Sequence, residues 1–332
     1  MTAPPHGIQD RLLSPPITDQ LGRTFRDLRL SVTARCNLSC TYCIPESGSH
    51  AGNRSLRPEE YVERILRIHA ESPLRSLRIT GGEPTLYRHL PELIKGIKQA
   101  GIPAVHMTSN GLLLAPVVQS LRTAGLDRLN ISLDAIDPEI LRRIGRSPRA
   151  DRVFAGIDAT QQAGLPLKLN STIYRGLNEN QIVPLFKYAA ARGITIRFLE
   201  LMNMGHLHNS VSDYLVREPE ILERISTVTA FRALPRAEAS TARYFETPTG
   251  ARFGIIANHS APFCGDCDRL RMDAGGRLYG CLSEDYGLEF PQAMGNTLAD
   301  REQVRRALRS LLAQKQPVRF RGSTLSMKSI GG

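Results

Sequence analysis

The stretch "LRLSVTARCNLSCTYC", from Leu28 to Cys43, joins a short β-rich run to three closely spaced cysteines. The run "LRLSV" has the composition of a strand. The cysteines follow it at C-x3-C-x2-C spacing, with no fourth cysteine nearby. A 4Fe-4S cluster is normally held by four thiolates, so three leave one iron free to bind another molecule. The alternative is a zinc site, although zinc usually takes four protein ligands in paired C-x2-C elements.

Similar β-rich runs recur at regular intervals through the first 200 or so residues. They begin at Leu77, Ala104, Arg128, Leu167 and Ile194. Segments with helical spacing separate them, at residues 58–71, 90–100, 117–124, 152–163 and 181–192. Proline fits the first helical turns (Pro58, Pro91), and glycine fits the stops (Gly101, Gly125, Gly164, Gly193). Strands that alternate with helices predict a parallel sheet with right-handed crossovers. Six units fall short of a closed eight-fold barrel, so we expect an α/β fold, a partial (β/α)6 TIM-type barrel.

The pattern changes after about residue 203. A helix is expected near residues 218–226 and another near 301–312, with short alternating runs "RYFE", "RFGIIA", "RLRMD" and "RLYGCL" between them. This pattern predicts a smaller C-terminal extension that carries the remaining cysteines. The predicted organisation is a flexible N-terminal arm at 1–24, the barrel at 25–203, the extension at 204–322 and a tail at 323–332.

Composition limits the possible functions. The chain has 332 residues, 41% of them hydrophobic, and no apolar run long enough to span a bilayer or to act as a secretory signal. We therefore expect a cytoplasmic protein without membrane association. In a reducing compartment its six cysteines favour metal or redox chemistry over disulfides. The net charge of +11 suits an anionic partner such as nucleic acid, a membrane surface or a phosphorylated small molecule, or it reflects composition alone.

The second cysteine group lies in "CGDCDRLRMDAGGRLYGC", Cys264 to Cys281, with the spacing C-x2-C-x13-C. His259, five residues upstream, completes a Cys3His set that would suit zinc. The alternative is a second iron-sulfur cluster with an open iron. Spacing alone leaves both interpretations open.

The first cysteine motif, with Tyr42 before its last cysteine, resembles the signature of radical S-adenosylmethionine enzymes. "TGGEP" at the end of the second expected strand and "NISLDA" at the end of the fourth match further motifs of that superfamily. The resemblance implies a 4Fe-4S cluster whose open iron binds S-adenosylmethionine and releases a 5′-deoxyadenosyl radical. Its implied cluster ligands are Cys36, Cys40 and Cys43, and its implied S-adenosylmethionine contacts are Tyr42, Gly82, Ser132 and Met202.

From about Phe25 to the last residue the chain resembles the GTP 3′,8-cyclase family, which opens molybdenum cofactor biosynthesis. The stretches "TSNGLLL", "IRFLELM", "FCGDCDRLRMDAGGRLYGCL" and the terminal "IGG" carry this resemblance. It implies a second 4Fe-4S cluster on Cys264, Cys267 and Cys281 that binds the guanine of GTP, while basic side chains bind the triphosphate. The implied GTP contacts are Arg29, Arg78, Thr108, Lys168, Arg197, Arg269 and Arg271.

The same resemblance implies a catalytic role for the terminal Gly331 and Gly332, which in the family reach into the active site. The chain departs from the family at Ser76, where some relatives carry a lysine near the substrate, and at Ala34, where an acidic residue is usual. The implied partners are GTP, an electron donor and a downstream cyclic pyranopterin monophosphate synthase. Nucleic acid is not expected as a partner, and the chain is expected to be a monomer or homodimer.

Two other functions remain open at this level. One is a radical S-adenosylmethionine peptide-modifying enzyme with an auxiliary cluster, although such enzymes commonly carry more cysteines in the extension. The other is a metal-stabilised nucleic-acid-binding protein. Its expected stacking platform is not evident, because aromatic residues make up 6% of the chain and tryptophan is absent.

Overall fold

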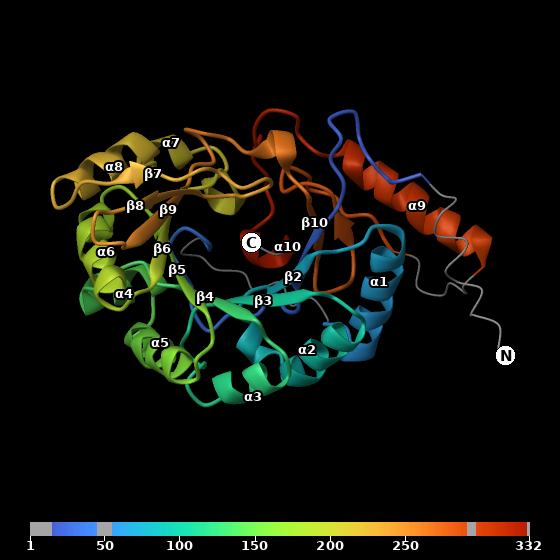
Figure 1. Cartoon of the computed structure of the whole chain (residues 1–332), viewed down its shortest axis with the longest axis horizontal. Helices are drawn as coiled ribbons and strands as arrows, with labels where there is room; N and C mark the ends of the chain where they lie inside the picture. Colours follow the sequence, from blue (N-terminus) through green and yellow to red (C-terminus); the bar gives the residue numbers. More distant parts are fainter. Residues whose placement is uncertain (1–14, 45–54, 291–296, 331–332) are drawn as a thin grey trace.

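The computed structural model describes residues 15–44, 55–290 and 297–330. Its first six strands are β1 (Asp27–Ser31), β2 (Ser76–Thr80), β3 (Ala104–Ser109), β4 (Arg128–Ser132), β5 (Leu167–Ile173) and β6 (Thr195–Glu200). They lie side by side in chain order, and each is parallel to the next. The sheet curves into an open arc with helices α1–α6 around its outside (Figure 1). The predicted α/β partial barrel is confirmed, and it is not closed.

The helices of the barrel are α1 (Pro58–Glu71), α2 (Leu90–Gln99), α3 (Val118–Thr123), α4 (Pro138–Gly145), α5 (Val153–Gln162) and α6 (Ile182–Ala191). Pro58 and Pro91 lie in first turns, as predicted. The four predicted stop glycines all have positive φ, for example 84° at Gly101 and 106° at Gly125. Helix α4 was not predicted, although Asp137 caps it by accepting hydrogen bonds from two backbone N–H groups of its first turn.

The extension is not a separate layer, because its strands extend the barrel sheet at both edges. They are β7 (Arg232–Ala233), β8 (Arg243–Glu246), β9 (Arg252–Ile256), β10 (Arg269–Met272) and β11 (Leu278–Tyr279). Strand β9 pairs in parallel with β6, and β10 pairs in parallel with β1. Antiparallel β8 and β7 follow β9 at one edge, and β11 follows β10 at the other. The six predicted strands therefore gain one parallel neighbour at each end.

The remaining helices are α7 (Val211–Tyr214), α8 (Glu218–Ser226), α9 (Leu298–Ala313) and α10 (Met327–Ile330). Helix α8 has the predicted bounds, and α9 begins three residues earlier than expected. No helix in the described part of the chain is long and apolar enough to cross a membrane.

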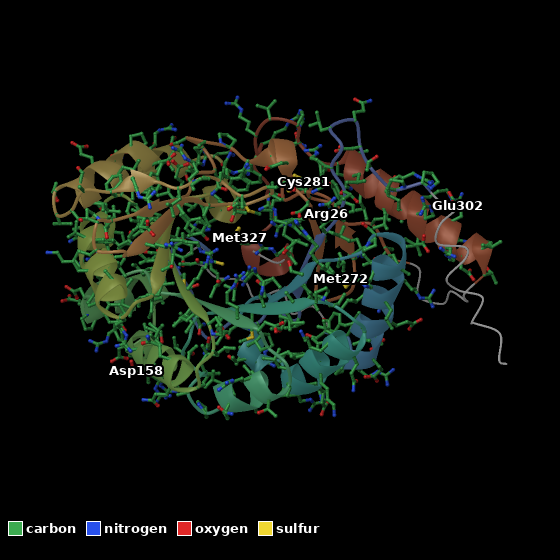
Figure 2. All side chains as sticks on the ribbon, viewed as in Figure 1. Arg26, Asp158, Met272, Cys281, Glu302 and Met327 are labelled. Atoms are coloured by element: carbon green, nitrogen blue, oxygen red, sulfur yellow. The ribbon has the colours of Figure 1, made fainter. Side chains whose placement is uncertain are left out.

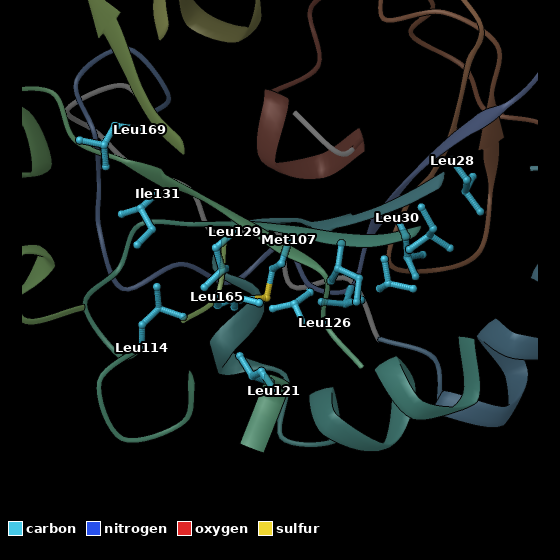
Figure 3. Packing of buried hydrophobic residues seen from close by; sticks show 14 of the residues in the cluster. Leu28, Leu30, Met107, Leu114, Leu121, Leu126, Leu129, Ile131, Leu165 and Leu169 are labelled. Carbon is cyan, nitrogen blue, oxygen red and sulfur yellow. The ribbon is translucent and has the colours of Figure 1, made fainter. Parts of the chain in front are cut away.

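The main core lies between the sheet and the surrounding helices. Leu28, Leu30, Met107 and Leu129 point from the strands toward the helical layer and are fully buried (Figure 3). Successive side chains of a strand point to opposite faces. The residues between these apolar positions, such as Arg29 and Thr108, therefore face the interior of the arc.

Both ends of the described chain pack against the domain. Residues 15–24 belong to the predicted flexible arm, yet Ile17 is buried in the main core and Arg23 is buried as well. At the other end, α10 lies inside the arc (Figure 1), and Ile330 is buried in a small cluster with Met204 and Tyr279. Gly331 and Gly332, the predicted catalytic residues, lie outside the described residues.

Candidate active site

One cavity of about 360 Å³ occupies the interior of the arc. All six cysteines are free thiols, and all six line this cavity. Figure 2 shows Met327 of α10 near the centre of the arc, with Cys281 above it in this view. The two cysteine groups are more than 200 positions apart in sequence, and the fold brings them to a common space.

The first cysteine group follows β1 and lies among polar groups from several strands. The amide Nδ2 of Asn110 lies 3.8 Å from the Cys36 Sγ, and the Ser326 Oγ lies 3.7 Å from the Cys43 Sγ. Tyr42 donates a hydrogen bond of 2.7 Å to Asp134. Burial raises the pKa of Cys36 to about 11 and the pKa of Asp134 to about 6. A thiol with a high pKa binds metal only with loss of its proton, so cluster binding and proton release are coupled here.

Gly81 and Gly82 permit a close approach of backbone to backbone. A Cβ at Gly82 would lie 2.1 Å from the Arg35 carbonyl oxygen, and one at Gly81 would lie 2.4 Å from the Thr33 oxygen. The Gly82 N–H donates to the Thr33 oxygen at 2.6 Å. The sequence suggested that these glycines make room for a ligand; the structure shows that they make room for the segment that leads to Cys36. Gly82 also lines the cavity, together with the predicted contacts Tyr42, Ser132 and Met202.

Glu83, which was not predicted as a site residue, stabilises the cysteine loop through hydrogen bonds to the end of β3. Its carboxylate is fully buried and accepts hydrogen bonds from the Ser109 Oγ at 2.8 Å and from the Asn110 N–H at 2.7 Å. The Asn110 side chain in turn reaches the first cysteine group. The "TGGEP" motif therefore links the ends of β2 and β3 to the cysteine loop.

The second cysteine group differs from the first in its charge environment. Burial raises the pKa of Cys264 to about 11. Burial acts in the same direction on Cys267, but the charges of Arg269 and Lys315 outweigh it and lower the pKa of that thiol to about 6. Arg269 donates from Nε to the Cys267 Sγ at 3.3 Å. This group therefore has cationic hydrogen-bond donors ready for a thiolate.

The structure gives no support to the zinc interpretations. Within residues 15–44, 55–290 and 297–330, no three His, Cys, Asp or Glu side chains converge closely enough for one metal ion. The Nε2 of His259 lies 3.0 Å from the Leu201 carbonyl oxygen, so this ring bonds to the chain just after β6. A cubane cluster binds each thiolate through a different iron, so its three thiolates need not converge on one point.

Four arginines on neighbouring strands form a layer in the wall of this cavity. In the register of the sheet, Arg29 on β1 lies opposite both Arg78 on β2 and Arg271 on β10. Arg269 lies two positions before Arg271 on the same face of β10. All four line the cavity, and three of them are 5–8% exposed.

Asp27 offsets only part of the positive charge in this layer. Burial and the neighbouring Arg29 charge lower the pKa of Arg78, and burial with the charges of Arg29 and Arg269 lowers that of Arg271 to about 9. Asp27 pairs with Arg29 at 2.8 Å and accepts a 2.6 Å hydrogen bond from Ser76. Among described residues the Arg78 Nε and Nη1 have no hydrogen-bond partner. Buried, unpaired donors of this kind favour a bound anion.

The three remaining predicted GTP contacts differ in their surroundings. Thr108 and Arg197 line the cavity, and Arg197 donates to Asn170 at 2.9 Å. Lys168 does not line it, because its ammonium donates to the Tyr244 hydroxyl at 2.9 Å. The Lys168 ammonium has three N–H donors, so the bond to Tyr244 leaves donors for a ligand.

The sequence analysis missed several polar residues of the cavity. Asn130 and Asn170 line it, and strand alternation provided a signal, since Asn170 lies two positions after Lys168. Lys328 of α10 also lines it, and its Nζ is shielded from solvent without a hydrogen-bond partner among the described residues. No local pattern indicates that a lysine five residues from the end of the sequence reaches this cavity.

Two family models match the chain in succession. Residues 30–189 match the Radical SAM superfamily, and residues 194–320 match Molybdenum Cofactor Synthesis C. The first match contains the first cysteine group, and the second contains the other. S-Adenosylmethionine and an iron-sulfur cluster are the cofactors of this superfamily.

Curated relatives cover nearly the whole chain. It is 37% identical to GTP 3′,8-cyclase of Synechococcus sp. (strain CC9605), over 91% of this chain and 92% of the relative. It is 37% identical to GTP 3′,8-cyclase of Staphylococcus carnosus (strain TM300), over 86% of this chain and 87% of the relative. Among solved structures, Streptococcus suis SuiB bound to S-adenosylmethionine is similar with a TM-score of 0.59 and 13% identity, over 80% of this chain and 63% of SuiB. At that identity the likeness to SuiB supports the fold alone.

Proposed function

The chain belongs to the GTP 3′,8-cyclase family, and on that basis we propose how its cavity carries out the family reaction. The enzyme converts GTP to (8S)-3′,8-cyclo-7,8-dihydroguanosine 5′-triphosphate, the first step of molybdenum cofactor biosynthesis. The observation that carries the assignment of roles is the arginine layer of Arg29, Arg78, Arg269 and Arg271, which lies in one cavity with two groups of three free thiols.

The first cysteine group is proposed to hold the cluster that binds S-adenosylmethionine. Its ligands are Cys36, Cys40 and Cys43, and three thiolates leave one iron open for the amino and carboxylate groups of the cofactor. When bound, these groups supply a radical that removes the hydrogen atom at C3′ of GTP. Tyr42, Gly82, Ser132 and Met202 are proposed to orient the cofactor, which is supported by their common position on the cavity wall.

The second cysteine group is proposed to hold a second 4Fe-4S cluster on Cys264, Cys267 and Cys281. The free thiols and the cationic donor Arg269 beside Cys267 support this assignment. The open iron of that cluster would hold the purine, so the base and the sugar lie at fixed positions between the two clusters. Binding both reacting parts of the substrate in one geometry lowers the entropy cost of bringing them together.

The arginine layer is proposed to bind the triphosphate. Guanidinium groups stay charged and present paired donors to phosphate oxygens. Arg29, Arg78, Arg269 and Arg271 supply most of this charge, while Thr108 and Arg197 contact the rest of the nucleotide from β3 and β6. Lys168 is proposed to join them from β5, with the donors that its bond to Tyr244 leaves free. The terminal Gly331 and Gly332 are proposed to complete the site, and the position of α10 inside the arc supports this.

The test is anaerobic reconstitution followed by assay with GTP, S-adenosylmethionine and a chemical reductant. We expect about eight irons per chain, which is the content of two cubane clusters, and 5′-deoxyadenosine in equal amount to the cyclised nucleotide. Cys36→Ala should abolish 5′-deoxyadenosine formation, whereas Arg269→Ala should mainly weaken GTP binding. Normal cofactor cleavage by Cys36→Ala would refute the assignment of the first group, and about four irons with one zinc would refute that of the second.

The other partners follow from the chemistry. Reduction of a cluster requires an external electron donor, and the cyclic product requires a downstream cyclic pyranopterin monophosphate synthase. We propose a monomer or homodimer that acts in the cytoplasm without nucleic acid or membrane.

A further inference from the structure

A buried lysine lies behind the second cysteine group, outside the cavity wall. Lys315 is 6% exposed, and its ammonium has three hydrogen-bonding neighbours. They are the Cys267 Sγ at 3.4 Å, the Arg269 carbonyl oxygen at 2.8 Å and the Gly280 carbonyl oxygen at 3.3 Å. One side chain therefore bridges the segment that carries Cys267 and the residue just before Cys281.

The position of Lys315 is fixed by close packing of α9 against the cysteine segment. A Cβ at Gly280 would lie 1.7 Å from the Leu311 carbonyl oxygen, so only glycine permits this approach. The Gly280 N–H donates to the Gln314 side chain at 2.7 Å, one residue before the lysine. The end of α9 and the strand before Cys281 thus form one rigid contact.

A second buried cation fixes the same region from the other side. Arg23 donates from Nη1 to the Cys264 carbonyl oxygen and to the Gln316 carbonyl oxygen, both at 2.8 Å. Its Nε pairs with Asp19 at 2.7 Å. The Cys264 loop is therefore tied to the residue next to Lys315, and Figure 1 shows the N-terminal segment beside α9.

We propose that Lys315 is a positioning residue for the iron-sulfur cluster on the second cysteine group: it holds the Cys267 and Cys281 segments together and stabilises the reduced cluster. This inference rests on the proposed function, because it requires a cluster at this group. Reduction adds one negative charge to the cluster, and a buried cation next to a ligand sulfur favours that state. Arg269 also bonds to this sulfur, but it lines the cavity and is proposed to bind the substrate. Lys315 does not line the cavity, and its two other hydrogen bonds go to backbone carbonyl oxygens.

The experiment uses a background in which Cys36, Cys40 and Cys43 are all alanine, so that only the second group binds iron. In it we compare Lys315→Met, which removes charge and hydrogen bonds, with Lys315→Gln, which keeps a donor but no charge, and with Lys315→Arg, which keeps the charge. Lys98→Met is the matched control, since Lys98 bonds to the Pro103 oxygen and to Asp127 away from the cysteines. The readouts are iron per chain and an anaerobic redox titration followed by electron paramagnetic resonance.

We expect Lys315→Met and Lys315→Gln to lower the ratio of reduced to oxidised cluster at a fixed potential about tenfold, a shift of about 59 mV for one electron. Lys315→Arg and Lys98→Met should keep the potential of the background. An unchanged potential in Lys315→Gln would overturn the inference while leaving the proposed function intact. If Lys315→Met does not fold, the Lys315→Gln variant alone provides the test. A background protein without iron at the second group would instead refute the two-cluster function, and the inference with it.

Discussion

Replacing Gly82 by alanine tests whether the glycine pair builds the first cysteine group. The added Cβ would lie 2.1 Å from the Arg35 oxygen and 2.9 Å from the Ala34 oxygen. Ordinary contact begins at 3.4 Å, so the Ala34–Arg35 backbone must move by about 1.3 Å or more. That movement breaks the hydrogen bonds that Thr33 and Arg35 accept from residues 82 and 83, at 2.6 and 2.8 Å.

The expected cost of Gly82→Ala follows from these two effects. Two lost backbone hydrogen bonds cost roughly 2 kcal/mol, and overpacking costs about 1–3 kcal/mol. We therefore expect the free energy of unfolding of the metal-free protein to fall by about 3–5 kcal/mol, measured by urea denaturation. Because the displaced segment leads directly to Cys36, iron should fall from about eight to about four per chain after reconstitution.

Gly275→Ala is the matched control for this prediction. A Cβ at Gly275 would meet only the Asp273 Oδ1, at an ordinary 3.4 Å. It should change stability by less than about 1 kcal/mol and leave the iron content unaltered. Full iron loading and wild-type stability in Gly82→Ala would refute the argument that this glycine holds the cysteine loop by close approach.

Three further predictions concern the polar lining of the cavity. Arg78→Met should raise the free energy of unfolding of the ligand-free protein by about 1–3 kcal/mol, because it removes a buried charge whose Nε and Nη1 have no partner and which the other arginines repel, and it should weaken GTP binding at least about tenfold; denaturation and calorimetry test both, and equal affinity would contradict the assignment. Burial raises the pKa of the Asp134 carboxyl from 3.8 to about 6, because it favours the neutral form in the folded protein. The stabilisation from this neutral form is therefore present at low pH and is lost as the pH rises from 3.8 through about 6. Asp134→Asn should therefore become more stable relative to wild type across that range, by up to about 3 kcal/mol, and parallel pH profiles would refute this. Tyr244→Phe removes a hydroxyl that bonds to both Lys168 and Arg197, so these cations lose a competing partner and GTP should bind up to about fivefold more tightly; weaker binding would contradict this.

Sequence patterns predicted the barrel well because its strands and helices alternate locally. Runs such as Ala104–Ser109 and Leu167–Ile173 coincide with observed strands, since their hydrophobic residues and flanking glycines carry the signal. Helix α4 was missed although Asp137 and Pro138 mark its start, because only one helix was expected between β4 and β5. The pairing of β9 and β10 with the barrel edges could not be predicted, because contacts between distant segments leave no local pattern.

The site was predictable to a similar degree. Most of the family contacts on the strands line one cavity, because alternate residues of parallel strands share a face. The six cysteines also line it, although they lie outside the strands, in the segments next to β1, β10 and β11. Lys168 is the exception among the predicted contacts: it does not line the cavity, and its ammonium bonds to the Tyr244 hydroxyl, which also bonds to the cavity residue Arg197. Lys315 and Lys328 could not be identified, since their roles depend on how residues after α9 fold back onto the sheet.

The pairing of β10 with β1 has a consequence for synthesis of the chain on the ribosome. When residue 200 has been added, β1 to β6 can already assemble, yet both outer strands still present unpaired N–H and C=O groups. Strand β9 reaches one edge after residue 256, and β10 reaches the other only after residue 272. A nascent chain stalled before that point exposes a strand edge to other chains. Protection of the sheet from aggregation during translation therefore depends on β9 and β10, which lie in the last quarter of the sequence.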